Sequence, residues 1–184
     1  MAPRIRPLTP AELDADQALL YAAIAGGPRA QGPQHFALTA ADGSLRGPFD
    51  IMLRSPALGT AQQELGASIR YRTKLADRER ELAILLVAAH EDSDFERESH
   101  EAIARALGFE DDELSAIRSL DVSAFAGREA FVGRAVVALL DGDLSDDEWD
   151  AASALLGVDG VFELTALVGY YATLALQLRV FRVR

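Results

Sequence analysis

Signals that begin and end α-helices recur along the whole sequence and constrain the fold more than any other feature. Capping boxes, in which serine or threonine is followed three residues later by glutamate, begin at Thr9 and Ser145. Apolar residues between such signals are spaced three and four apart, as on one face of a helix. No segment shows the two-residue alternation between hairpin turns that is typical of strands. The sequence therefore predicts an all-α bundle of about seven or eight helices.

The bounds of the expected helices follow from these signals and from the glycines and prolines between them. We expect helices at residues 10–25, 56–71, 78–90, 95–107, 110–119, 124–140, 146–157 and 159–181. Asp77 and Asp94 are the expected caps of two of them. Residues 26–48 are rich in glycine and proline, which predicts a loop with a short helix around residues 35–40. His35 in this loop is a candidate for lining a pocket.

The length of 184 residues suits one domain with one core. We expect a single domain over residues 1–184, in which residues 1–45 form an N-terminal helix and loop and residues 46–184 form the core. Apolar residues make up 49% of the chain, enough for a core and part of a partner surface. Residues 164–178 carry no charge, but a membrane span needs about 20 apolar residues. This run is therefore expected to be a buried core or interface helix.

Charge and cysteine content exclude several classes of function. The formal net charge is −11, so nucleic acids and anionic membranes would be repelled and are not expected partners. The chain has no cysteine, which excludes disulfides, zinc–thiolate sites, iron–sulfur clusters and thiol nucleophiles. The N-terminal residues show no apolar run of signal-peptide type, so a cytoplasmic location is expected.

Glu81 is the first candidate for chemistry. It shares a helical stripe with Ile84, Leu85 and Ala88, so its carboxylate is expected to be partly buried. Burial raises the pKa of a carboxyl group unless cations or hydrogen-bond donors oppose it, and a raised pKa suits general acid or base catalysis. The alternative is a structural ion pair with Arg78 or another arginine.

His100 is the second candidate and lies on the next expected helix. Glu96 precedes it by four residues and so shares its face, where a carboxylate orients an imidazole and supports its charged form. The alternative is a packed histidine with a hydrogen-bonded partner. A metal site formed by Glu81, Glu96 and His100 is a weaker hypothesis, because the Glu-x-x-His motif of di-iron bundles and the His-Glu-x-x-His motif of zinc proteases are absent. We expect no metal and no cofactor.

Four segments, in this order, resemble the carboxymuconolactone decarboxylase family, which includes the alkylhydroperoxidase D-like proteins. They are Gly47-Pro48-Phe49-Asp50 leading to Ser55-Pro56, the block at residues 78–85, residues 94–105 with His100, and residues 164–171 ending in Tyr170-Tyr171. The likeness covers roughly residues 45–184. It implies an alkylhydroperoxidase D-like helical fold, a small site between helices, and assembly as homotrimers or hexamers.

The resemblance also implies site residues. In the peroxidase branch the site holds a glutamate, two cysteines three apart, and a histidine four residues after the second cysteine. Glu81 takes the place of the glutamate and His100 that of the histidine, whereas the cysteine places fall on Ser93 and Glu96. A serine and a carboxylate cannot alternate between dithiol and disulfide, so this chain cannot run a thiol peroxidase cycle.

Two hypotheses remain. The first is a cofactor-free lyase that transfers protons on a small carboxylic acid or lactone, with Glu81, His100 and Glu96 as catalytic residues and Arg105 and Ser93 binding the substrate. Arg97 and Arg72 are further candidates for binding a substrate carboxylate. The second is a non-catalytic oligomeric binding or scaffold protein that kept the fold without the thiols.

Overall fold

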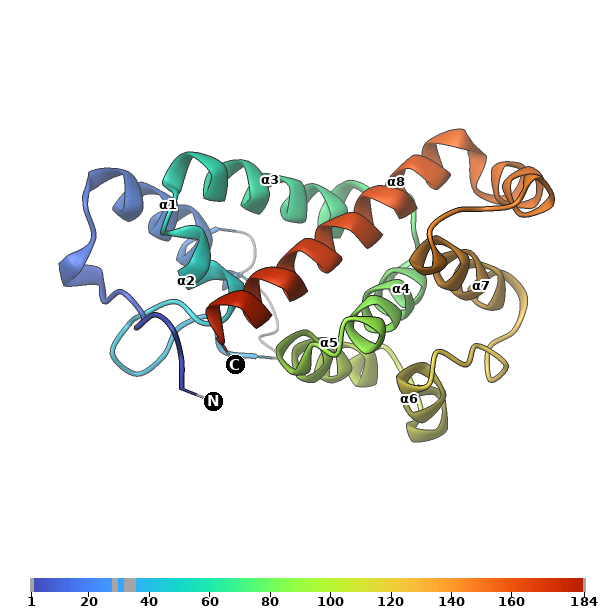
Figure 1. The fold of residues 1–184 in the computed structure, drawn as a ribbon, viewed down its shortest axis with the longest axis horizontal. Coiled ribbons are helices and arrows are strands. Elements are labelled where there is room, and N and C mark those ends of the chain that lie inside the picture. The colour runs from blue at the N-terminus through green and yellow to red at the C-terminus, as the bar shows by residue number, and fades with distance from the viewer. Residues whose placement is uncertain (1, 28–29, 32–35, 184) are drawn as a thin grey trace. The chain divides into compact units, whose positions relative to one another are not determined.

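The computed structural model describes residues 2–27, 30–31 and 36–183. Within these residues the chain forms eight α-helices and one short 3-10 helix (Figure 1). The only β-pairing among them is a single bridge between Thr39 and Leu45. The elements are η1 (Pro10–Glu12), α1 (Ala15–Ala25), α2 (Pro48–Met52), α3 (Pro56–Arg72), α4 (Asp77–His90), α5 (Asp94–Ala106), α6 (Asp111–Arg118), α7 (Gly127–Asp141) and α8 (Asp146–Phe181). The predicted all-α fold of about seven or eight helices is confirmed.

The chain divides into two compact units. The first unit consists of Met1–Ala67 and Leu176–Arg184, and the second is Ser68–Ala175. The division falls within α3 and α8, whereas the sequence predicts a boundary near residue 45, between the N-terminal helix and loop and the core. The single domain over residues 1–184 stays a prediction.

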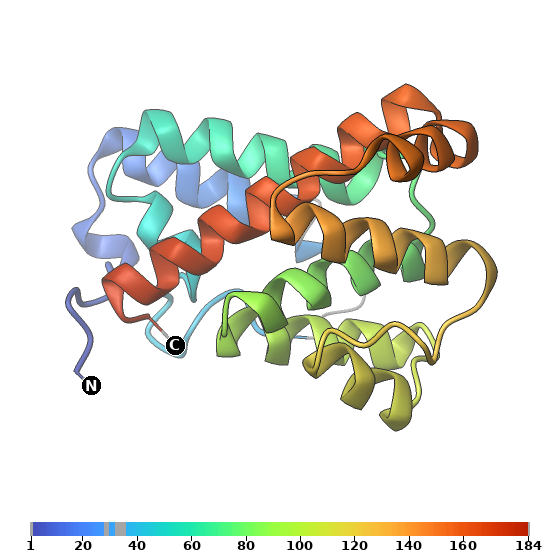
Figure 2. The same cartoon turned by 45° about the vertical axis from the view of Figure 1, so that its right-hand side comes forward.

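Helix α4 is the centre of the second unit. It packs against α5, α6 and α7, and Figure 2 shows it between α5 and α7. Its residues Leu82, Leu86 and Val87 are completely buried, as expected of a helix that is apolar on nearly every face. Gly133 allows α7 to approach Val122, in the segment between α6 and α7, since a Cβ at position 133 would lie 2.8 Å from Cγ1 of Val122.

The start of the chain differs from the prediction. The capping box of Thr9 and Glu12 forms only the single turn η1, because Leu13 is extended with φ −73° and ψ 135°. A second box then begins α1, in which Gln17 N–H donates to Asp14 Oδ1 at 2.9 Å and Asp14 N–H donates to Gln17 Oε1 at 3.0 Å. The first helix therefore begins at Ala15, after the reciprocal bonds of this second box.

The predicted loop also differs in detail. It ends in α2, a short helix that the sequence analysis missed. Residues 36–40 are not helical, since Thr39 pairs with Leu45 instead. His35 lies outside the described residues.

Two predicted caps are shifted by one residue. Asp77 is the first residue of α4, and the backbone N–H of Ala76 before it donates to Glu79 Oε2 at 3.0 Å. Asp94 likewise is the first residue of α5, with Ser93 at the cap position. Both aspartates thus lie in the first turn, where a carboxylate still interacts favourably with the helix dipole.

The last helix contains the predicted break at Gly157. This residue has φ 76° and ψ 160°, so α8 consists of two helical segments that meet there. By length and composition alone α8 could span a membrane, but a buried core helix passes the same test. Leu164 and Leu167 are completely buried, as expected of a core helix.

Candidate active site

The site is formed where α4 and α5 pack together in the second unit. Glu81 lies in the middle of α4 and has no exposed surface, and His100 on α5 is 7% exposed. The Nδ1 atom of His100 lies 2.6 Å from Oε2 of Glu81. The structure therefore joins the two residues that the sequence singles out by a direct buried hydrogen bond between consecutive helices.

The helical stripes explain why these side chains point toward each other. On α4, Ile84, Leu85 and Ala88 are buried on the same stripe as Glu81. On α5, the buried residues Glu96, His100 and Ile103 follow each other at three- and four-residue spacing. Because each helix turns its buried stripe toward its neighbour, a polar residue on either stripe has few partners other than one on the opposite stripe.

Glu81 is held as a carboxylate despite its burial. Burial raises the pKa of Glu81, but the charge and hydrogen bond of His100 and the charges of Arg70 and Arg80 together outweigh it and keep this pKa below its usual value. Oε1 of Glu81 lies 3.7 Å from Nε of Arg80, too far for a hydrogen bond. Arg78 is not the partner of Glu81, because it binds Glu113 and Glu129.

The bond to Glu81 fixes the tautomer of His100. A carboxylate only accepts hydrogen bonds, so Nδ1 of His100 carries a proton and donates it to Oε2. The other ring nitrogen, Nε2, makes no hydrogen bond to any described residue. The ring also contacts Tyr171 edge to face, at a centroid distance of 5.3 Å. Nε2 is thus the position of the pair at which a proton can be taken up or released.

Glu96 differs from its expected role. It is 2% exposed, and neither of its carboxyl oxygens has a hydrogen-bond partner among the described residues. Burial raises the pKa of Glu96 to about 8, with the adjacent Ser93 hydroxyl opposing this rise and the charge of Glu91 adding to it. Glu96 is therefore mainly a neutral carboxylic acid at pH 7, and the structure gives the role of orienting His100 to Glu81.

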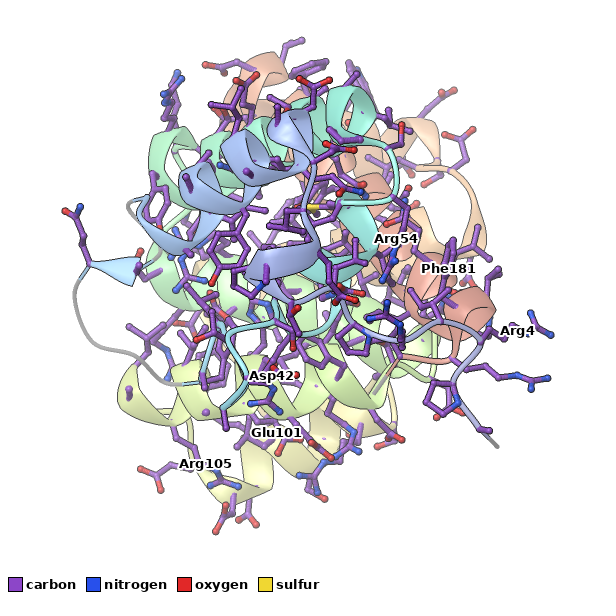
Figure 3. All side chains as sticks on the ribbon, turned by 90° about the vertical axis from the view of Figure 1, so that its left-hand side faces the viewer. Arg4, Asp42, Arg54, Glu101, Arg105 and Phe181 are labelled. Atoms are coloured by element: carbon purple, nitrogen blue, oxygen red, sulfur yellow. The ribbon has the colours of Figure 1, made fainter. Side chains whose placement is uncertain are left out.

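The predicted substrate-binding residues lie in two different settings. Ser93 is buried at the start of α5, one turn from Glu96. Arg105 is half exposed and forms an ion pair with Asp111, and it projects outward in Figure 3. Arg97 pairs with Asp94 at 2.7 Å, not with its acidic neighbours further along the helix. Neither arginine contacts Glu81 or His100.

Arg80, like Arg70, is a cation near the site that the sequence analysis missed. Its side chain is 11% exposed, and it pairs with Asp77 at 2.8 Å while its Nε atom points toward Glu81 without a hydrogen bond. It precedes Glu81 directly and so lies beside the apolar stripe, not on it. Helical spacing gave no signal for it, since the stripe pattern selects residues three and four apart.

No group of three histidine, aspartate or glutamate side chains in the described part of the chain could hold a metal ion. The three candidate ligands serve other purposes here, because Glu81 and His100 bind each other and Glu96 is mainly protonated. The donor set thus suits proton transfer better than metal coordination.

Comparison with known proteins finds a family model that matches part of the chain. The model of the carboxymuconolactone decarboxylase family matches residues 56–139. This range contains α4 and α5 with Glu81 and His100, whereas the resembling segments around residues 47–50 and 164–171 lie outside it. No curated protein matches the sequence.

Proposed function

Because residues 56–139 match the model of the carboxymuconolactone decarboxylase family, we propose that this chain is a cofactor-free lyase acting on a small carboxylic acid or lactone. The observation that carries the proposal is the buried bond of 2.6 Å between Glu81 and His100, which leaves Nε2 of the imidazole open. The catalytic activity and the substrate are our inference from this geometry and from the family.

His100 is the proposed proton donor. When the bond between the substrate and its carboxylate breaks, the electron pair stays on the substrate carbon and carbon dioxide leaves. A proton from Nε2 of the imidazolium forms the new C–H bond, and a proton from water restores the imidazolium. The anionic Glu81 stabilises the imidazolium and fixes the ring during this transfer.

Glu96 supports the same chemistry through its neutral state. An ionised Glu96 on the face that carries His100 would repel a substrate carboxylate, whereas a carboxylic acid donates a hydrogen bond to it. We propose that Glu96 binds the substrate or returns a proton to His100, with Ser93 as a second donor. Thiol peroxidase activity is excluded for the chain alone, because it contains no cysteine.

The test is a screen of small lactones and carboxylic acids with purified protein, repeated with His100→Gln and Glu81→Gln. Glutamine at position 100 can still donate an amide hydrogen bond to Glu81 but cannot transfer a proton, so the fold is retained while activity falls by roughly a hundredfold or more. His90 and Glu98 are exposed residues of the same two helices, and His90→Ala and Glu98→Gln serve as matched controls. Activity that survives in both site variants would remove Glu81 and His100 from the mechanism.

Exposed apolar side chains near the break in α8 favour a second candidate function. Leu155, Val158 and Phe162 near the break in α8 are 41%, 64% and 73% exposed, and such surfaces often bind a partner. We propose that the chain forms homotrimers or hexamers, as its family resemblance implies, and a non-catalytic scaffold protein would need only this property. Light scattering tests the assembly, and a mass near 19.8 kDa would contradict it. Assembly without activity on any compound of the screen would favour the scaffold.

A further inference from the structure

The first unit contains a cavity of about 360 Å³. Glu81 and His100 do not line it and belong to the second unit. Its walls are formed by the N-terminal arm (residues 3–7), the loop before α2 and the C-terminal residues Arg182 and Val183. Arg4 ties the arm to the end of α8, because its backbone N–H donates to the carbonyl of Phe181 at 3.1 Å and its side chain donates to that of Val180 at 2.8 Å (Figure 3). The cavity is thus bounded by segments that hydrogen bonds hold together.

Most of the lining is apolar. It includes Ile5, Pro7, Leu45 and Val183, and Leu45 is nearly fully buried. The volume lies at the small end of the range typical of pockets that bind small molecules, roughly 300 to 1,000 Å³. A ligand that fills this cavity therefore needs a compact apolar body.

Two arginines give the cavity a positive charge that the protein does not neutralise. Arg46 and Arg182 line it, and the guanidinium group of neither forms an ion pair or hydrogen bond with any described residue. The neighbouring Arg54 differs, since it binds Asp50 Oδ2 at 2.7 Å and the carbonyl of Arg6.

The one carboxylate in the lining does not oppose an anion. Asp50 is 3% exposed, and both of its oxygens are occupied, one by Arg54 and the other by the N–H of Leu8 at 2.8 Å. Its charge is therefore balanced within the protein. The sequence of the first unit contains eight arginines and six acidic residues, whereas that of the second contains ten basic and 23 acidic residues. An organic anion is thus attracted to the first unit of a chain that is strongly acidic as a whole.

We propose that this cavity binds a small organic acid, with its carboxylate on Arg46 and Arg182 and its apolar body against Ile5, Leu45 and Val183. Guanidinium groups bind carboxylates through charge-assisted hydrogen bonds. The apolar walls disfavour inorganic anions, because these have no apolar body to pack against them. This site does not depend on the proposed lyase activity. It gives the chain a second ligand site in a different unit.

The experiment titrates benzoate into the intact protein by calorimetry, with benzyl alcohol and inorganic phosphate as comparison ligands. We expect benzoate to bind at least about tenfold more tightly than either, since neither combines charge with an apolar body. Arg46→Gln and Arg182→Gln should each weaken benzoate binding by roughly tenfold. Arg134→Gln removes the same charge from an exposed position of α7 and should change the affinity by less than about twofold.

Two further variants locate the binding. Val183→Trp should fill the cavity and abolish binding without a change of charge, whereas His100→Gln should leave the affinity for benzoate unchanged. Phosphate binding as tight as benzoate binding, an unchanged affinity in both arginine variants, or loss of binding in His100→Gln would each overturn the proposal. Thermal unfolding of every variant separates loss of the site from loss of the fold.

Discussion

Replacing Glu96 with glutamine should make the protein more stable at alkaline pH. Glutamine has nearly the shape of a neutral carboxylic acid but cannot ionise. Glu96 is 2% exposed and its carboxyl oxygens have no hydrogen-bond partner among the described residues. Ionising it therefore places a negative charge in the interior that only the nearby Ser93 hydroxyl stabilises, and the substitution removes this cost.

The magnitude follows from the pKa of Glu96. Burial raises this pKa from 4.5 to about 8 in the folded protein. Between these values the folded chain holds a proton that the unfolded chain has lost, so the free energy of unfolding falls as the pH rises, by about 1.4 kcal/mol per pH unit. The full effect is on the order of 5 kcal/mol and is reached above the folded pKa. Below about pH 4.5 both states are protonated, and the glutamate and glutamine proteins should be similarly stable.

Urea unfolding of both proteins between pH 5 and pH 9 measures the difference. We expect the advantage of Glu96→Gln to grow through this range and to level off above about pH 8. Glu98→Gln on the exposed face of α5 should show no such trend. A difference between wild type and Glu96→Gln that is the same at every pH would refute the reasoning, as would a carboxyl carbon of Glu96 that titrates near its ordinary pKa in NMR.

Three substitutions test other parts of the structure. Gly133→Ala should lower the free energy of unfolding by about 1–3 kcal/mol, because its Cβ would lie 2.8 Å from Val122; urea unfolding close to wild type would contradict the close approach of α7. Gly157→Ala should cost about 1–2 kcal/mol, because the residue has φ 76° and its Cβ would lie 2.5 Å from Asp159; an unchanged melting temperature would count against the break in α8. His100→Ala should lower the free energy of unfolding by about 3–5 kcal/mol, because it leaves Glu81 as a buried unpaired carboxylate. His100→Gln should restore part of this stability, and equal stability of the two variants would argue against the bond to Glu81.

The sequence predicted the helices and the burial of Glu81 and His100 for the same physical reason. A helix buries one stripe, so a polar residue such as Glu81 or His100 on an apolar stripe must lie inside, next to whatever packs there. The helix of the capping box at Thr9 was misplaced because Asp14 offers a competing box that the residue pattern alone does not rank. Local signals thus fix the kind of element better than its first residue.

The chemistry of each site residue could not be predicted, because it depends on contacts between helices. Glu96 lies one turn from His100 on the same helix, which suggested a hydrogen bond between them, yet the partner of His100 comes from α4. The side chain of Arg80 lies beside Glu81, with its Nε atom 3.7 Å from Oε1, although helical spacing does not place the two residues on one stripe. Helical spacing shows which residues share a face, but the hydrogen bonds across a packed interface depend on how two helices are rotated against each other.

The pair of Glu81 and His100 and the nearby Glu96 form a system with an uneven distribution of protons. Glu81 is held ionised by its cationic neighbours, while Glu96, lacking any, is held neutral. Two carboxyl groups of the same chemistry are therefore pushed in opposite directions by their surroundings, a pattern that separates an acid from a base in known active sites. A dithiol at the positions of Ser93 and Glu96 would store electrons, whereas a carboxylic acid at position 96 stores a proton. A neutral acid beside an ionised pair is thus an arrangement that suits the proposed proton transfer, and the proposed lyase activity would use both states.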